Sequence, residues 1–179
     1  MKDNATLDNK QPSEFNFEGV RWELPTKMES ISAAGEEIER QLLELGWSKD
    51  EIIDIRIALS DLLANAIGHG NLGIQHVSEG KMLSEAITEK LETESCDKKV
   101  VLEIELSSSR AEITIEDEGD GFDYEKVESP LHGAQLMETH GRGVYILNHL
   151  PGVSIRYEGK GNRVILTKER STASDAAGE

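Results

Sequence analysis

Three polar side chains interrupt an otherwise aliphatic stretch of the sequence, at a spacing that suits chemistry. Asp61, Asn65 and His69 are four residues apart, so in a helix they share one face. Burying an acid, an amide and an imidazole without partners is costly, so such a face needs a reason. One interpretation is a pocket wall, in which a carboxylate base stands beside an amide oxygen that can hold Mg²⁺. The alternative is a solvated polar stripe on an amphipathic helix.

The second candidate is the acidic, glycine-containing run from Asp117 to Phe122. Asp117 continues the alternation of a predicted strand, so its carboxylate points to the same side as Ala111, Ile113 and Ile115. A carboxylate there can accept a hydrogen bond from an exocyclic amine such as that of adenine. Gly119 and Gly121 allow the backbone to turn sharply and approach a ligand. The alternative is a tight acidic turn. A calcium loop is not indicated, because neither a closing bidentate Glu nor flanking helices are evident.

The third candidate lies at the start of a predicted short helix, where Gly141, Arg142 and Gly143 precede Val144. Glycines at a helix start expose free N–H groups, and the helix dipole favours an anion there. The guanidinium of Arg142 adds a charge that can bind phosphate. The run is neither a P-loop nor a dinucleotide fingerprint, because it lacks GKS or GKT and a preceding buried parallel strand.

Two long helices are predicted to position the first of these sites. Thr26 and Glu29 can form a capping box for the first helix, which ends at Gly46 and has the apolar stripe Ile31, Ala34, Ile38, Leu42 and Leu45. Ser48 and Glu51 form a second capping box, before a helix whose apolar residues are Ile52, Ile55, Leu59, Leu62, Leu63, Ala66 and Ile67. That helix carries the polar face.

Alternating residues predict a strand over 15–24, bulged at Gly19 and stopped by Pro25, and two hairpins, one over 102–115 and one over 153–166. Residues 72–98 read as an insertion with an extra helix around Ile87. Strands in adjacent hairpins with helices between them predict an α+β fold. We expect a two-layer sandwich, with a mixed, mostly antiparallel sheet covered on one face by helices.

The composition limits the environments and partners of the chain. A formal charge of −16 should repel nucleic acid and anionic lipid, and no apolar run is long enough to span a membrane. The single cysteine, Cys96, allows no intrachain disulfide and suits a reducing cytosol, so we expect a cytoplasmic protein. Residues 1–14 and 171–179 are polar and are predicted to be disordered tails of one domain over 15–170.

The three runs, taken together and in this order, resemble the signature boxes of the GHKL, or Bergerat-fold, ATPases. That superfamily includes gyrase-like ATPases, MutL, sensor histidine kinases and anti-sigma factor serine kinases. The resemblance covers roughly residues 20–168. The run from Asn65 to Asn71 is most similar to the anti-sigma kinase branch, where the box commonly reads NAxxHG. The sequence offers no room for a phosphoacceptor helix or a transducer domain, which also favours that branch.

The resemblance implies a role for each matching residue, with ATP and Mg²⁺ as cofactors. Asn65 would coordinate Mg²⁺. Asp117 would bind the adenine amine, with Gly119 and Gly121 beside the base. Residues 123–140 would form a lid over ATP. At the helix start, the phosphates would contact Gly141, Arg142 and Gly143. Asn162 stands where many relatives carry Thr, and would supply a hydrogen bond near the adenine.

Asp61 departs from the family, which usually has Glu as the general base. Its side chain is one methylene shorter, and an offset of ~1 Å in a catalytic group can cost on the order of a hundredfold in rate. The insertion at 72–98 is a second departure, either a partner-docking surface or a packing helix.

Three functions remain open at this point. The first is a serine/threonine kinase that phosphorylates a small antagonist protein and sequesters a sigma factor or similar regulator. The second is a nucleotide-dependent binding module without phosphotransfer, for which Asp61 is the motive. The third is a histidine-kinase-like domain that acts on a partner's histidine. The resemblance also implies a homodimer formed through the sheet.

Overall fold

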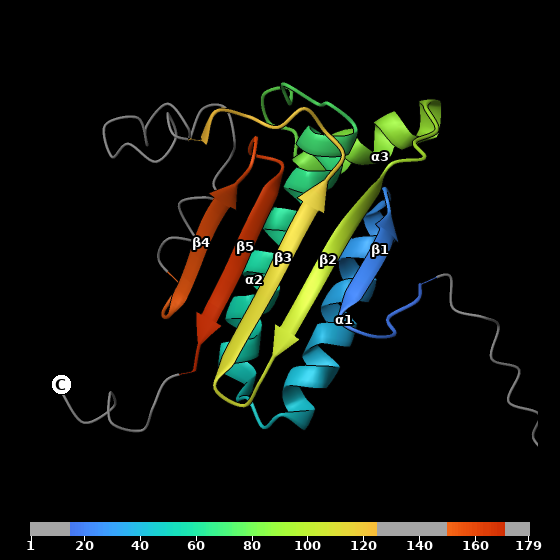
Figure 1. Ribbon diagram of the computed structural model, residues 1–179. Coiled ribbons are helices and arrows are strands. Elements are labelled where there is room, and N and C mark those ends of the chain that lie inside the picture. The colour runs from blue at the N-terminus through green and yellow to red at the C-terminus, as the bar shows by residue number, and fades with distance from the viewer. Residues whose placement is uncertain (1–14, 125–149, 171–179) are drawn as a thin grey trace, which may run out of the picture.

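The computed structural model describes residues 15–124 and 150–170. Figure 1 shows two layers, a five-stranded sheet with α1 and α2 running behind it. Helix α3 lies at the end of the sheet where β3 ends and β2 begins. The described elements are β1 (Arg21–Pro25), α1 (Met28–Glu44), α2 (Lys49–Asn65), a π-helical turn η1 (Ala66–Asn71), α3 (Leu83–Thr93), β2 (Lys99–Leu106), β3 (Arg110–Asp117), β4 (Val153–Glu158) and β5 (Arg163–Glu169).

The strand order is β1-β2-β3-β5-β4, and each pairing between described strands is antiparallel. The predicted α+β sandwich with one helix-covered face is confirmed. No parallel pairing occurs among the described strands, so the "mixed" part of that expectation is not seen there. β2–β3 and β4–β5 are antiparallel pairs of consecutive strands. The two pairs are joined where β3 pairs with β5, which is also antiparallel.

The core lies between the sheet and the helices. Alternate strand residues face the helices and are buried, among them Trp22, Leu24, Leu102, Ile104, Ile113, Ile115, Val164 and Leu166. The other sheet face carries charged side chains in cross-strand ion pairs, in which Arg163 contacts Glu103, Glu116 and Glu158. The period-2 pattern of the strands therefore separates a dry face from a solvated one. None of the described helices is both long and apolar enough to cross a bilayer.

One lysine occupies a helix-facing position of the sheet. Lys168 is 2% exposed and its Nζ donates to Asp54 Oδ2 at 2.9 Å, and also to the Pro151 carbonyl. A buried ammonium persists only where it is paired and hydrogen-bonded, which these two acceptors provide. The pair ties the end of β5 to the start of α2.

The second predicted capping box is confirmed and the first is wrong. Ser48 and Glu51 form the reciprocal bonds at the start of α2. The first helix begins after Lys27 without a side-chain cap, because Thr26 is buried and its Oγ1 donates to the Lys98 carbonyl at 2.6 Å. A hydroxyl used in this long-range contact cannot also cap the helix.

The predicted first strand is also shorter than its pattern. The ladder with β2 covers Arg21–Pro25, preceded by one bond from Ile104 N–H to the Val20 carbonyl at 2.7 Å, and the Gly19 backbone turns at φ +74° just before it. Phe15 and Phe17 lie outside the ladder. The Phe17 ring packs edge-on against Trp22 with 4.7 Å between ring centroids. Their alternation with polar residues reflects this packing over Trp22 rather than strand pairing.

The inserted helix α3 is part of the hydrophobic core. Ile87 is fully buried in the same apolar cluster as the α1 and α2 residues. A Cβ placed on Gly68 of η1 would lie 2.9 Å from Leu83 Cδ1 and 3.1 Å from Ile87 Cδ1. The helix therefore packs directly on η1, and a larger residue at position 68 would require Leu83 or Ile87 to move.

Ile87→Ala is expected to lower the free energy of unfolding by about 2–5 kcal/mol, because it leaves a cavity at a fully buried site. The measurement is urea denaturation followed by circular dichroism. Thr88→Ala is the matched control, since Thr88 is exposed on the same helix. A loss below about 0.5 kcal/mol for Ile87→Ala would contradict the core role of α3.

Candidate functional site

The C-terminal end of α2 continues into the π-helical turn η1, where Leu72 N–H donates to the Ile67 carbonyl at 2.9 Å. Such turns are rare and frequently occur at functional sites. Gly68 of this turn contacts α3, whereas Gly70 faces the end of β3. The polar face predicted from sequence thus leads directly to the glycine-rich turn after β3.

Asp61 and Asn65 are brought together on α2 as their spacing predicts. Asn65 Nδ2 donates to Asp61 Oδ2 at 3.1 Å, and both side chains are half-buried. Burial raises the pKa of the Asp61 carboxyl above its ordinary value, while the Asn65 hydrogen bond and the nearby His69 act in the opposite direction. Because the Asn65 nitrogen is directed at Asp61, its amide oxygen is turned away from that carboxylate.

Asp117 stands at the end of β3 with its carboxylate fixed by the following turn. Gly119 N–H donates to Asp117 Oδ1 at 2.8 Å. Burial raises the pKa of Asp117 to about 6, although the Gly119 hydrogen bond and the charges of Lys160 and Lys98 oppose the shift. A carboxylate held at this depth with an oxygen to spare can accept a hydrogen bond from a ligand.

The Asp117 carboxylate packs closely on two glycines. A Cβ on Gly70 would fall within 2.6 Å of both carboxylate oxygens, and a Cβ on Gly119 would lie 2.7 Å from the Gly70 carbonyl carbon. No side chain fits at either position. Sequence reasoning assigned Gly119 to the turn and to nucleotide binding, but it gave Gly70 no role in the site. The signal for Gly70 was its place in the run from Asn65 to Asn71.

Two loops meet beside this carboxylate. Phe122 N–H donates to the Lys160 carbonyl at 3.0 Å, and both Gly121 and Gly161 have positive φ. A Cβ on Gly121 would lie 2.8 Å from the Lys160 carbonyl carbon, and one on Gly161 would lie 2.8 Å from Phe122 N. Asn162 belongs to the same junction, since its Nδ2 donates to the Asp117 carbonyl at 2.8 Å. The Asn162 amide nitrogen therefore binds the backbone of the Asp117 turn.

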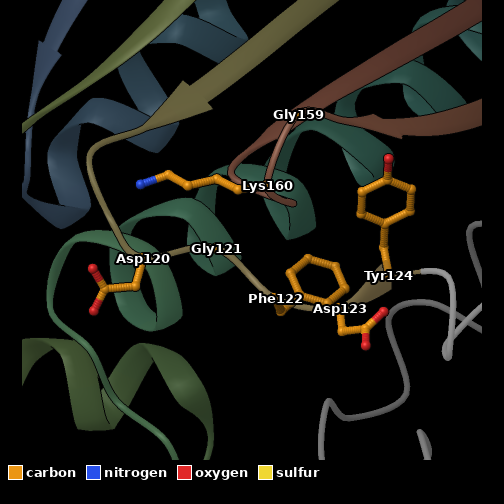
Figure 2. A pocket seen from close by; sticks show the side chains of 7 residues that line it. All are labelled: Asp120, Gly121, Phe122, Asp123, Tyr124, Gly159 and Lys160. Carbon is orange, nitrogen blue, oxygen red and sulfur yellow. The ribbon is translucent and has the colours of Figure 1, made fainter.

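A cleft of about 430 Å³ opens at this junction, lined by Asp120, Gly121, Phe122, Asp123, Tyr124, Gly159 and Lys160 (Figure 2). In Figure 2 the Lys160 side chain extends along the loop toward Asp120, and Phe122 and Tyr124 lie at the other end. Gly121 is the only predicted site residue among those lining this cleft. Asp61, Asn65 and Asp117 lie outside it, toward α2 and η1.

Several predicted site residues lie outside the described part of the chain. These are Gly141, Arg142, Gly143 and all but the first two residues of the predicted lid, 123–140. The roles assigned to them stay predictions, as does the short helix after Gly143. The two predicted tails, 1–14 and 171–179, also lie outside the described residues.

The described residues suit a shared cation better than a protein-only metal centre. They contain no group of three or more His, Cys, Asp or Glu placed to hold a metal ion. A hard cation that also binds phosphate oxygens needs few protein ligands, and an amide oxygen such as that of Asn65 is one it accepts.

Gly70→Ala is expected to weaken binding of an adenine nucleotide by at least about tenfold, because the new methyl overlaps the Asp117 carboxylate. Gly35→Ala is the matched control, since its Cβ would meet only the flexible end of Arg56. Calorimetric titration of ATP measures both. Equal affinities for the two variants would show that the packing of Gly70 on Asp117 does not matter for binding.

Comparison with known proteins identifies a family and two relatives. The sequence pattern of the histidine kinase-like ATPase domain matches residues 24–168. Serine-protein kinase RsbW of Listeria innocua is 22% identical over 155 residues, 83% of this chain and 85% of the relative. Serine-protein kinase RsbW of Bacillus subtilis is 21% identical over 141 residues, 75% of each chain.

Proposed function

Because the chain belongs to the family of histidine kinase-like ATPase domains, we propose that it binds Mg·ATP and acts as a serine/threonine protein kinase. The observation that carries the proposal is the half-buried Asp117 carboxylate, packed on Gly70 of η1 and on Gly119, with the Asp61–Asn65 pair on the helix that leads into η1. The names of the two relatives, both serine-protein kinases, support the choice of activity. The proposed domain is 15–170, with the insertion at 72–98 and a lid at 123–140.

Nucleotide binding follows from the chemistry of the groups present. Asp117 accepts a hydrogen bond from the exocyclic amine of adenine, and Gly119 and Gly121 let the backbones of Gly70 and Lys160 pack closely around the turn that holds this carboxylate. The Asn65 amide oxygen would hold Mg²⁺, which would supply charge neutralisation at the phosphates. Gly141, Arg142 and Gly143 contact the phosphates. Asn162 supports the site by holding the Asp117 carbonyl.

Phosphotransfer then needs one base and correct alignment. Asp61 accepts the proton of a substrate Ser or Thr hydroxyl as the hydroxyl oxygen bonds to the γ-phosphorus. The bond from that phosphorus to the bridging oxygen breaks, and ADP leaves. Burial of Asp61 raises its pKa, which makes the carboxylate a stronger base at neutral pH.

The partners proposed are proteins. We propose that the kinase phosphorylates an anti-sigma factor antagonist and holds a sigma factor or similar regulator in a cytoplasmic partner switch. The acidic chain suits protein partners rather than nucleic acid or a membrane surface. The proposal includes a homodimer, and light scattering of the purified protein measures the mass of the assembly.

The test is transfer of labelled phosphate from ATP to an antagonist encoded beside this protein. Acid-stable phosphate on Ser or Thr is the expected product, whereas acid-labile phosphate would indicate a histidine kinase. ATP binding without any transfer to that partner would leave the alternative, a nucleotide-dependent binding module. The observation that favours this alternative is Asp61, whose shorter side chain is already bonded to Asn65.

A further inference from the structure

Asn71 is a buried amide that the proposed chemistry does not use. It ends η1 and is 5% exposed. Burying an amide is costly unless its donors and acceptor are paired. A residue of this kind at the edge of a ligand site therefore holds other groups in place.

The Asn71 side chain joins three segments that are distant in sequence. Its Nδ2 donates to Thr26 Oγ1 at 2.8 Å and to the Lys99 carbonyl at 3.0 Å. Its Oδ1 accepts from Glu118 N–H at 2.8 Å. These bonds connect the turn between β1 and α1, the start of β2 and the turn after β3.

Thr26 completes this network. It is 4% exposed, and while its Oγ1 accepts from Asn71 it donates to the Lys98 carbonyl at 2.6 Å. The donor direction of the Asn71 amide is therefore fixed, because Thr26 uses its own proton on Lys98. With the amide nitrogen so directed, the amide oxygen must face Glu118.

The network acts on both sides of the Asp117 carboxylate. Asn71 follows Gly70, whose backbone packs on that carboxylate, and it binds the N–H of Glu118, the residue after Asp117. Movement of Asn71 would therefore separate Gly70 from the Asp117 turn. No atom of the ligand needs to touch Asn71 for this effect.

We propose that Asn71, held by Thr26, is a positioning residue that orients Asp117 and the Gly70–Gly119 cradle for the adenine base. This inference rests on the proposed nucleotide binding. It assigns Asn71 an effect on affinity for the base and not on the proton transfer at Asp61, which lies on the preceding helix.

The experiment compares variants of the full chain by calorimetric titration of Mg·ATP. Asn71→Leu is expected to raise the Kd by roughly 10- to 100-fold, since a misplaced buried hydrogen bond to a charged group has effects of that size. Thr26→Val, which removes the acceptor and donor, is expected to raise the Kd several-fold, and Thr26→Ser, which keeps the hydroxyl, is expected to retain affinity. At saturating ATP, phosphotransfer by Thr26→Val should match the wild type.

Ser30→Ala is the matched control. Ser30 is fully buried beside Thr26, and its hydroxyl donates to the Pro25 carbonyl at 2.7 Å, away from Asp117. Ser30→Ala should lower the melting temperature without raising the Kd. Equal losses of affinity in Ser30→Ala and Thr26→Val would overturn the proposal, because the effect would then be structural.

The dependence of the Kd on pH is a second readout. The charged groups around Asp117 are Lys160, Lys98 and Glu116. A loosened turn admits water to Asp117, which lowers its pKa, so the pH at which binding weakens should move down in Asn71→Leu and Thr26→Val.

Wild-type protein that binds no ATP would refute the proposed function itself. Wild-type protein that binds ATP, with folded Thr26→Val equal to it in affinity and pH profile, would refute the role of Asn71. If Asn71→Leu does not fold, the Thr26 and Ser30 variants decide the question.

Discussion

Asp117→Asn is expected to raise the Kd for ATP by about 10- to 100-fold or more while the protein stays folded. The side-chain oxygen of Asn can still accept from Gly119 N–H, but an amide NH₂ then replaces the oxygen that faces the adenine amine. Calorimetric titration with and without Mg²⁺ is the measurement. Unchanged affinity would remove Asp117 from the site.

The pH dependence of this effect has a definite sign. The pKa of Asp117 is raised to about 6, so the ionised acceptor is lost as pH falls through 6 and wild-type binding should weaken there. The contribution to stability runs the other way. Between about pH 4 and 6 the native carboxyl keeps a proton that the unfolded chain has released, so the stability contributed by this group falls as pH rises.

Asp117→Asn should therefore be more stable than the wild type at pH 7.5, by roughly 1 kcal/mol after allowance for the partly exposed carboxylate. At pH 4 the two proteins should melt together. Thermal unfolding at both pH values checks this. A variant that melts below the wild type at pH 7.5 would show that the charge is not destabilising. A gain in stability with a loss of binding would show that Asp117 supports binding although its charge lowers the stability of the fold.

Asp61→Asn is expected to lower the rate of phosphotransfer by about 10²- to 10⁴-fold, the usual effect of removing a general base. The Kd for ATP should change less than about twofold, since this carboxylate contacts Asn65 rather than the adenine-binding turn. Single-turnover transfer of labelled phosphate separates the two quantities. Activity should also fall as pH decreases through the raised pKa of Asp61, because the protonated acid cannot accept a proton.

Asp61→Glu tests the missing methylene. If reach limits the base, the longer side chain should increase the rate by up to about a hundredfold. If Asp61→Glu creates activity that the wild type lacks, the chain is a binding module in its native form. Full transfer by Asp61→Asn would exclude any role of residue 61 as the base.

Local patterns predicted the elements that depend on local physics. The alternation of β2 and β3, the Ser48–Glu51 box and the four-residue spacing of Asp61 and Asn65 are each set within a few residues, and the structure places them as expected. The inserted helix was found from its periodicity as well. Its depth of burial was not, because that depends on Gly68, which lies outside the helix.

The features that sequence reasoning missed depend on partners far away in the chain. Thr26 fits a capping box by spacing, but the structure commits its hydroxyl to Lys98 and Asn71. Lys168 shares the alternation of Val164 and Leu166, and only the fold shows that Asp54 and Pro151 supply the acceptors for a buried lysine there. Gly70 appears as a helix end, and only the fold brings the Asp117 carboxylate against it. Propensity and periodicity contain no information about such pairs.

The two glycines of η1 also bear on how this sequence can vary. Gly68 meets Leu83 and Ile87 of the insertion, and Gly70, two positions later, meets Asp117. A larger residue in α3 pushes on a turn whose far side is the ligand-binding carboxylate, so substitutions in the two places should not be additive. In a library that varies both, the tolerated size at residue 87 should therefore depend on the residue at 68, and epistasis should extend from the insertion to the pocket.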